Sequence, residues 1–153
     1  MPHIHDKIDF TVEVFVVYNK KVLLRKHDKY KKWLSVGGHI ELDENPNEAA
    51  IREVKEEVGI EVELLGSTPT FKSESSGYIE LIPPIFLNKH RINETHEHVT
   101  LVYFATAKTD VLKLSQKEKS DEVRWFTKQE LEENGYGVSE SIRHYALKAL
   151  ENS

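Results

Sequence analysis

Residues 38–60 read GHIELDENPNEAAIREVKEEVGI and contain the strongest helix signal in the chain. Asn45 is a favourable N-cap residue, Pro46 occupies the preferred first helical position, and Glu48 follows the cap by three residues. Gly59 is the residue type that most often ends a helix. These signals predict a helix over 46–58 with a loop on either side.

The predicted helix has an apolar face and an acidic face when its residues are placed at 100° intervals. Ile51, Val54 and Val58 fall together, and we expect them to be buried. Small Ala49 lies on the other side, where it leaves space beside the acidic residues. Those residues are three carboxylates: Glu53, Glu56 and Glu57.

Three like charges within little more than one helical turn weaken a helix by a few tenths of a kcal/mol per pair. A hard divalent cation such as Mg²⁺ or Mn²⁺ would offset this repulsion, because such cations favour oxygen ligands. The alternative is a solvated acidic surface that binds no metal.

The composition is that of an ordinary globular protein, and 153 residues predict a single domain, 1–153. The net charge of -5 argues against binding to a nucleic-acid polymer. The absence of cysteine excludes disulfides and fits a cytoplasmic protein. No apolar run approaches the roughly 20 residues that span a membrane, and the first ten residues lack a signal-peptide layout.

Segments rich in β-branched and aromatic residues predict strands at 10–18, 22–26, 62–66, 77–87, 98–107 and 121–126. Pro83 and Pro84 require a break or an edge in the fourth of these strands. Residues 27–33 are predicted to form a polar loop, and further helices are predicted at 127–134 and 139–152. Because strands dominate and helices are dispersed among them, the fold class is α/β or α+β with a mixed sheet.

The spacing within 38–60 is itself distinctive: Gly38, five residues, Glu44, seven residues, Arg52-Glu53, Val54, one residue, Glu56-Glu57, one residue, Gly59-Ile60. This pattern resembles the Nudix box of the Nudix hydrolase superfamily (MutT-like), with Asp43 where many members have glycine. The order of the other predicted elements is also similar to that family, over nearly the whole chain. The resemblance implies an α/β fold of Nudix type, an α/β/α sandwich with a mixed β-sheet between helices.

The resemblance also implies roles for the residues that match the motif. Three glutamates would be the catalytic ligands of Mg²⁺ (or Mn²⁺): Glu53, Glu56 and Glu57. The carbonyl of Gly38 would be a further metal ligand. Glu44 and Arg52 would form a structural ion pair that fixes the loop to the helix.

Catalytic candidates outside the motif depend on position alone. Family members often take a catalytic carboxylate from a later loop, and Glu97 is our first choice for it, with Glu94 second. Glu56 and Glu57 are candidates for the same role from within the motif.

Three further residue groups are candidates for binding. Arg25 lies before the motif and is a candidate phosphate ligand. Tyr78 resembles a tyrosine of dinucleoside-polyphosphate hydrolases and is a candidate substrate-binding residue. His96 and His98 alternate onto one strand face and could ligate zinc, although ordinary sheet positions are the alternative.

The activity implied by the resemblance is hydrolysis of a diphosphate linkage in a nucleoside diphosphate joined to a group X. A nucleoside triphosphate pyrophosphatase of MutT type is the default expectation. The alternatives are a hydrolase of nucleotide sugars or dinucleoside polyphosphates, a non-catalytic Nudix-fold nucleotide-binding or regulatory domain, and an acidic-helix interaction protein without a metal. The expected partner is a small-molecule nucleotide derivative, with no nucleic-acid polymer and no membrane, and a homodimer is possible.

Overall fold

The computed structural model describes residues 7–28, 30–71, 75–114 and 122–153. Its elements in chain order are β1 (Ile8–Tyr18), β2 (Lys21–His27), β3 (Lys32–Leu34), β4 (Val36–His39), α1 (Pro46–Val58), β5 (Val62–Leu64), β6 (Phe86–Asn93), β7 (His96–Ala107), β8 (Glu122–Thr127), α2 (Lys128–Glu133) and α3 (Glu140–Glu151).

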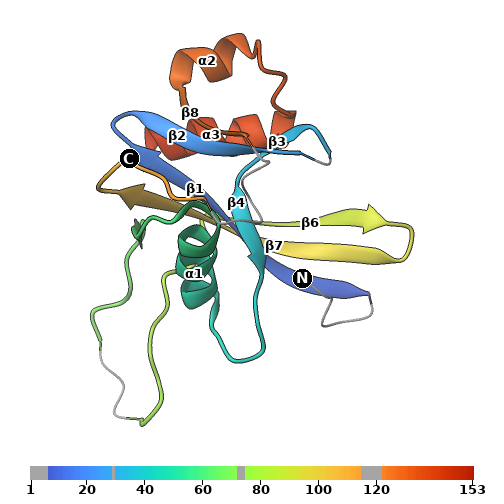
Figure 1. Ribbon diagram of the computed structural model, residues 1–153. Coiled ribbons are helices and arrows are strands. Elements are labelled where there is room, and N and C mark those ends of the chain that lie inside the picture. The colour runs from blue at the N-terminus through green and yellow to red at the C-terminus, as the bar shows by residue number, and fades with distance from the viewer. Residues whose placement is uncertain (1–6, 29, 72–74, 115–121) are drawn as a thin grey trace.

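A mixed eight-stranded sheet forms the middle layer, with the main strand order β3-β2-β1-β7-β5. The long strands β1 and β7 pair in parallel at its centre, and the other pairs are antiparallel. Strand β4 pairs with β1, β6 pairs with β7, and β8 pairs with β2. Helix α1 lies on one face of the sheet, and α2 and α3 lie on the other (Figure 1). This arrangement confirms the predicted α/β/α sandwich.

Side-chain alternation along the central strands creates two separate cores. Phe15 and Val17 of β1 belong to the core that includes residues of α2 and α3. Val12, Val14 and Val16 belong to the core that includes α1. Even-numbered residues in this part of β1 therefore face α1, and odd-numbered residues face the opposite side.

The predicted helix over 46–58 is confirmed, and its ends are those that the sequence indicates. The Asn45 side chain accepts a hydrogen bond from the Glu48 backbone N–H at 3.0 Å. The Glu48 carboxylate accepts one from the Asn45 N–H at 3.0 Å, which completes a capping box. Gly59 adopts a left-handed conformation with φ 73°, a backbone region that favours glycine and ends the helix.

The predicted burial of Ile51 is wrong, since its side chain is 41% exposed. Val54 and Val58 are fully buried, as expected, but the rest of the inward face consists of two alanines and two glutamates: Ala49, Ala50, Glu53 and Glu57. The helix is rotated so that these glutamates face the sheet, which moves Ile51 outward. An amphipathic pattern alone did not indicate this rotation, because it assumes that carboxylates avoid burial.

The predicted strand at 77–87 is also wrong, because β6 begins at Phe86. The backbone of Ile82 is paired with the side chain of Asn47 instead of with another strand. Asn47 Nδ2 donates to the Ile82 carbonyl at 2.9 Å, and its Oδ1 accepts from the Ile82 N–H at 2.8 Å. Pro83 and Pro84 have no N–H to offer a neighbouring strand, so the segment becomes a connection fastened to α1.

The remaining predictions differ from the structure at the ends of elements. Asn19 and Lys20 form the tight turn between β1 and β2 with φ of 46° and 62°, as a two-residue hairpin turn requires. The predicted loop at 27–33 is shorter, because β2 extends to His27 and β3 begins at Lys32. Among the described residues, none of the helices has the length and apolar character needed to cross a membrane.

The orientation of α1 predicts different costs for two similar truncations. Val54→Ala should lower the free energy of unfolding by about 2 kcal/mol, because it leaves a cavity under a fully buried side chain. Ile51→Ala should change it by about 0.5 kcal/mol or less, because Ile51 is exposed and alanine favours the helix. Urea denaturation of both variants measures the difference, and equal costs would contradict this orientation.

Candidate functional site

Arg52 holds β4 and the following loop against α1. Its Nε donates to Glu44 Oε2 at 2.9 Å and one Nη donates to Glu44 Oε1 at 2.6 Å, which makes a bidentate pair. The same Nη donates to the carbonyl of His39 at 3.1 Å, at the end of β4. The hydrogen bond from Arg52 is the main reason that the pKa of the Glu44 carboxyl is lowered.

Two of the three carboxylates of α1 contact this guanidinium, and the three differ in exposure. Glu53 and Glu57 are 6% and 7% exposed, whereas the Glu56 side chain is 60% exposed. Arg52 Nη1 lies 3.1 Å from a carboxylate oxygen of Glu53 and 3.1 Å from one of Glu56. Burial raises the pKa of the Glu53 carboxyl, and the charge of Arg52 partly opposes that rise.

Arg25 of β2 approaches the other buried carboxylate. Its Nη2 lies 3.2 Å from Glu57 Oε2, and both side chains are largely buried. The structure therefore brings Arg25 into the acidic cluster, where it stabilises Glu57 in the charged form. Its contact with a phosphate stays a prediction.

The close approach of β4 to α1 depends on Gly38. A Cβ atom at this position would lie 2.4 Å from Glu53 Oε1, so no side chain fits without displacing the carboxylate. Gly38 pairs with Val12, which places it on the side of the sheet that faces α1. The backbone of β4 thus lies beside the carboxylates, where its carbonyl is available as a candidate ligand.

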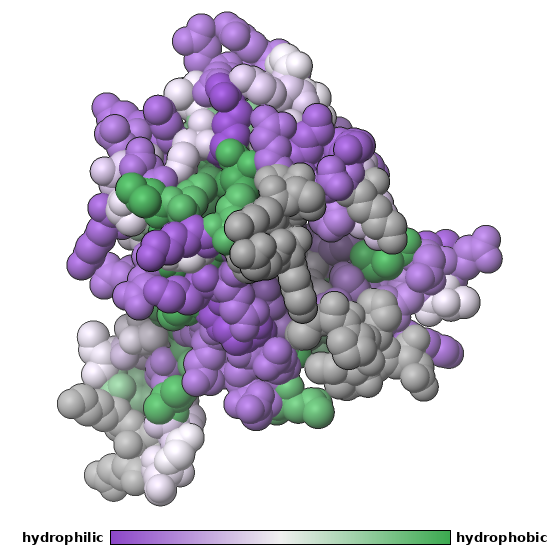
Figure 2. Space-filling model, in the orientation of Figure 1, coloured by the Kyte–Doolittle hydropathy of each residue, from purple (hydrophilic) through white to green (hydrophobic). Residues whose placement is uncertain are grey.

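The donor set fits a hard divalent cation. The available atoms are carboxylate oxygens and a backbone carbonyl, which are the ligands that Mg²⁺ and Mn²⁺ prefer. Burial disfavours the charge on Glu53, and a cation would offset that cost. The surface around α1 is mainly hydrophilic, so a charged substrate meets a polar surface there (Figure 2).

Glu97 lies on β7, and its side chain is 2.9 Å from Nζ of Lys89 on the neighbouring strand. Glu97 pairs with Ile8, four residues before Val12, which is the partner of Gly38. At about 3.3 Å per residue this is roughly 13 Å along the sheet. Glu97 is therefore not part of the cluster around Arg52 in this conformation.

Tyr78 and Glu94 also lie outside the acidic cluster. Tyr78 is exposed in the connection before β6, and its hydroxyl donates to Glu80 Oε1 at 2.5 Å. Glu94 is in the turn between β6 and β7 and is exposed. The position of these two residues gives them no contact with the carboxylates of α1.

A cavity of about 610 Å³ on the face opposite α1 was not identified from the sequence. Residues of β1, β3, β6 and α3 contribute to its walls. Aromatic and polar side chains are mixed in its lining, among them Trp33, Tyr145, Asn88 and Glu13. Such a mixture is typical of sites that bind a heterocyclic group.

Glu13 is the most unusual residue of this cavity. One carboxyl oxygen, Oε1, is buried and has no hydrogen-bond partner among the described residues. Burial raises the pKa of the carboxyl to about 7, and a hydrogen bond with Ser35 partly opposes the rise. The signal in the sequence was a single acidic residue within the apolar stretch FTVEVFVVY.

Strands β4 and β1 lie between the cavity and the acidic cluster. Glu13, in the cavity wall, pairs with Gly37, and Gly38, beside Glu53, pairs with Val12. Consecutive residues of a strand face opposite sides of the sheet, so the two features lie on opposite faces.

Comparison with known proteins gives consistent results. A family model described as NUDIX domain matches residues 8–146. The structure of a NUDIX-family hydrolase from Clostridium perfringens is similar with a TM-score of 0.84 and 39% identity, covering 94% of this chain and 96% of that one. A MutT NUDIX hydrolase from Burkholderia pseudomallei shares the fold with a TM-score of 0.65 at 20% identity, covering 96% and 98% of the two chains.

A curated relative is the dihydroneopterin triphosphate diphosphatase of Haemophilus influenzae. It is 38% identical over 78 residues, which are 51% of this chain and 48% of that protein. The match thus spans about half the length of each protein.

The raised pKa of Glu13 predicts a pH-dependent stability. Its ordinary value is 4.5 and its folded value is about 7, so the folded state is destabilised as pH rises through this range and the carboxyl ionises. Glu13→Gln should exceed the wild type by about 1 kcal/mol at pH 5, where the unfolded carboxyl is already partly ionised, and by about 3 kcal/mol at pH 8.5. Melting temperatures measured from pH 5 to pH 8.5 check this, with exposed Glu63→Gln as the control. A stability difference that is independent of pH would contradict the assignment.

Proposed function

The chain belongs to the NUDIX hydrolase family, and we propose that it uses Mg²⁺ or Mn²⁺ to hydrolyse a diphosphate linkage in a nucleoside triphosphate or a closely related triphosphate. The observation that carries the proposal is the buried pair Glu53 and Glu57: Glu53 lies beside Gly38 and Arg52, and Glu57 lies beside Arg25. Carboxylate oxygens held beside the backbone of β4, where Gly38 has no side chain, suit a metal that also binds phosphate.

The residues of the cluster would then hold the metal or position its ligands, and Glu56 would in addition accept a proton. Glu53, Glu56 and Glu57 would hold the metal, with the carbonyl of Gly38 as a further ligand. When bound, the metal would offset the negative charge of the diphosphate and lower the pKa of a water molecule that it binds. Arg52 positions two of the carboxylates and the loop, and Arg25 positions Glu57.

We assign the proton acceptor to Glu56 in preference to Glu97. The side chain of Glu56 is 60% exposed within the acidic cluster, so it has access to the attacking water. Glu97 is paired with Lys89 and lies roughly 13 Å away along the sheet. Glu97 would need a rearrangement of its strand or loop to reach the same water.

The cavity around Glu13 supports a heterocyclic group on the substrate. Tyr145, which is only partly buried, offers an aromatic surface, and the carboxyl of Glu13 can accept hydrogen bonds from ring N–H and amino groups. A bicyclic ring with adjacent N–H and NH₂ donors fits this carboxyl, and both guanine-type bases and pterins have such an edge. A MutT-type nucleoside triphosphate is the first candidate. A pterin triphosphate is the second, favoured by the name of the Haemophilus influenzae relative.

A hydrolysis screen tests the reaction and the substrate together. It should include nucleoside triphosphates with ordinary and oxidised guanine, dihydroneopterin triphosphate, nucleotide sugars and dinucleoside polyphosphates, with both products identified. We expect Mg²⁺-dependent release of pyrophosphate from a guanine or pterin triphosphate. Turnover restricted to sugars or dinucleoside polyphosphates would contradict the substrate, and binding without any turnover would favour a regulatory domain.

Glu57→Gln should abolish the Mg²⁺-dependent turnover and leave the chain folded. The substitution keeps the size of the side chain but removes the charge that the metal and Arg25 contact. We expect a loss of at least about a hundredfold in kcat, measured at saturating Mg²⁺. Glu61→Gln is the matched control, because Glu61 is exposed just after the helix. Full turnover by Glu57→Gln would exclude the metal assignment.

Glu56→Gln and Glu97→Gln separate the two candidates for the proton acceptor. We expect the first to lower kcat by about a hundredfold or more and to alter the acidic limb of the pH–rate profile. The second should leave kcat within about threefold, since its carboxylate is paired with Lys89. The reverse order of effects would assign the role to Glu97.

A further inference from the structure

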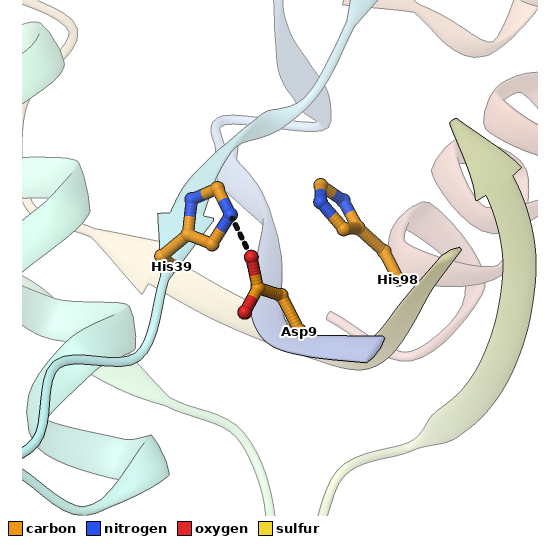
Figure 3. A group of neighbouring side chains, drawn as sticks. All are labelled: Asp9, His39 and His98. Carbon is orange, nitrogen blue, oxygen red and sulfur yellow. Dashed lines mark ion pairs between the residues drawn. The ribbon is translucent and has the colours of Figure 1, made fainter. Parts of the chain in front are cut away.

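Histidines from two neighbouring strands surround Asp9 on the sheet face opposite α1. The side chains of His39, on β4, and His98, on β7, lie on either side of Asp9 on β1 and turn toward it (Figure 3). His39 Nε2 is 3.2 Å from Asp9 Oδ2. One potential ligand atom from each of the three residues lies within 4.8 Å of the other two.

We propose that Asp9, His39 and His98 bind one divalent first-row transition-metal ion, with Zn²⁺ as the probe, at a site separate from the carboxylates of α1. The two sites use different residues on opposite faces of the sheet. Binding of zinc is independent of the proposed hydrolysis, so one can fail without the other.

The backbone already places the three ligands together. Asp9 pairs with His98 in the parallel ladder, and His39 pairs with Thr11, two residues along β1. Paired residues and residues two apart share one face of a sheet, so all three side chains project to the same side. Strands β4, β1 and β7 therefore supply one ligand each from neighbouring positions of the paired strands.

The separations suit a zinc ion after a small adjustment. Metal–ligand distances of about 2.1 Å in a tetrahedron separate the ligand atoms by roughly 3.3 Å. The distance of 3.2 Å between His39 and Asp9 already matches this value. The widest separation, at most 4.8 Å, would have to decrease by about 1.5 Å or less, which rotation of one imidazole can supply.

The chemistry of the three groups favours a transition metal over an anion or Mg²⁺. A phosphate bound between the histidines would meet the carboxylate of Asp9, which is 1% exposed and so poorly screened by water. Two imidazoles and one carboxylate are typical ligands of Zn²⁺, whereas Mg²⁺ prefers oxygen ligands alone. A cation between the three side chains would offset the burial of the Asp9 charge.

A fourth side chain, that of His96, contacts the Asp9 carboxylate. His96 is buried, and its Nε2 is 3.2 Å from Asp9 Oδ2 in hydrogen-bonding geometry. Metal sites in proteins commonly orient their ligands through such outer hydrogen bonds. His39 and His98 are less buried than Asp9 as whole residues, and Nε2 of each is buried.

Occupancy of the site would connect three strands next to the acidic cluster. His39 directly follows Gly38, and its carbonyl accepts the hydrogen bond from Arg52. A metal on the side chain of His39 would tie the end of β4 to β1 and β7. Zinc should therefore stabilise the fold as well as bind.

Calorimetric titration with Zn²⁺ in excess Mg²⁺ tests the proposal. Two further histidines, His3 and His5, lie outside the described residues, so a His3→Ala/His5→Ala background is used to remove them as ligands. We expect one zinc per chain, with affinity at least about a hundredfold weaker in His98→Ala and in His39→Gln. His144→Ala is the control, because His144 is exposed on α3 and should leave the affinity unchanged.

Two other measurements distinguish the possible outcomes. Zinc at a hundred times its Kd should raise Tm by roughly 5–10 °C in the background protein and not in His98→Ala. Anomalous scattering at the zinc edge from a crystal should place the ion between Asp9, His39 and His98. Unchanged affinity in both histidine variants would overturn the proposal. Loss of the bound zinc in Glu57→Gln, with retention in His98→Ala, would also overturn it by assigning zinc to the acidic cluster.

Discussion

The burial of two carboxylates on α1 is the constraint on which the rest of this structure depends. Glu53 and Glu57 face the sheet, where desolvation disfavours their charge, and two guanidiniums from Arg52 and Arg25 approach them. This orientation of the helix explains why Ile51 is exposed and why small side chains fill the rest of the interface. An ordinary amphipathic helix would bury the isoleucine. The fold therefore accepts a less apolar core beneath α1 in order to hold acidic groups at defined positions.

Strand β4 transmits this constraint to the other side of the sheet. Gly38 must lack a side chain because Glu53 occupies that space, and Gly37 pairs with Glu13. His39 continues the alternation and directs its imidazole toward Asp9. Gly38 therefore contributes to the acidic cluster, and the next residue, His39, contributes to the histidine cluster on the other face. A short strand with one paired edge can do this because neighbouring side chains in a strand point in opposite directions.

The features that the sequence predicted correctly are those encoded locally. The capping residues around Asn45 and the glycine at position 59 define the helix without reference to its surroundings, and the observed bounds agree with them. The failures involve partners distant in sequence. The segment at 77–85 is not a strand because Asn47, more than thirty residues earlier, pairs with its backbone. The spacing of the motif identified the three glutamates of α1 as candidate metal ligands, but the cavity around Glu13 required the registers of β1, β3 and β6 and the packing of α3.

The polar residues of β1 show why ligand sites arise at two places on one strand. Asp9, Thr11 and Glu13 lie in a row on the face away from α1, in a strand whose residues from Val12 to Val17, apart from Glu13, form the core. Each buried polar group needs a partner, and the three solutions differ. The Thr11 hydroxyl pairs with that of Thr100 at 2.7 Å, which satisfies two neutral groups with each other and requires nothing more. Glu13 and Asp9 are acids. A hydrogen bond with Ser35 only partly opposes the rise in the pKa of Glu13 that burial causes, whereas two imidazoles, those of His39 and His96, lie 3.2 Å from Asp9 Oδ2. The middle of the row is therefore structural, and its two acidic ends lie in the cavity and in the histidine cluster.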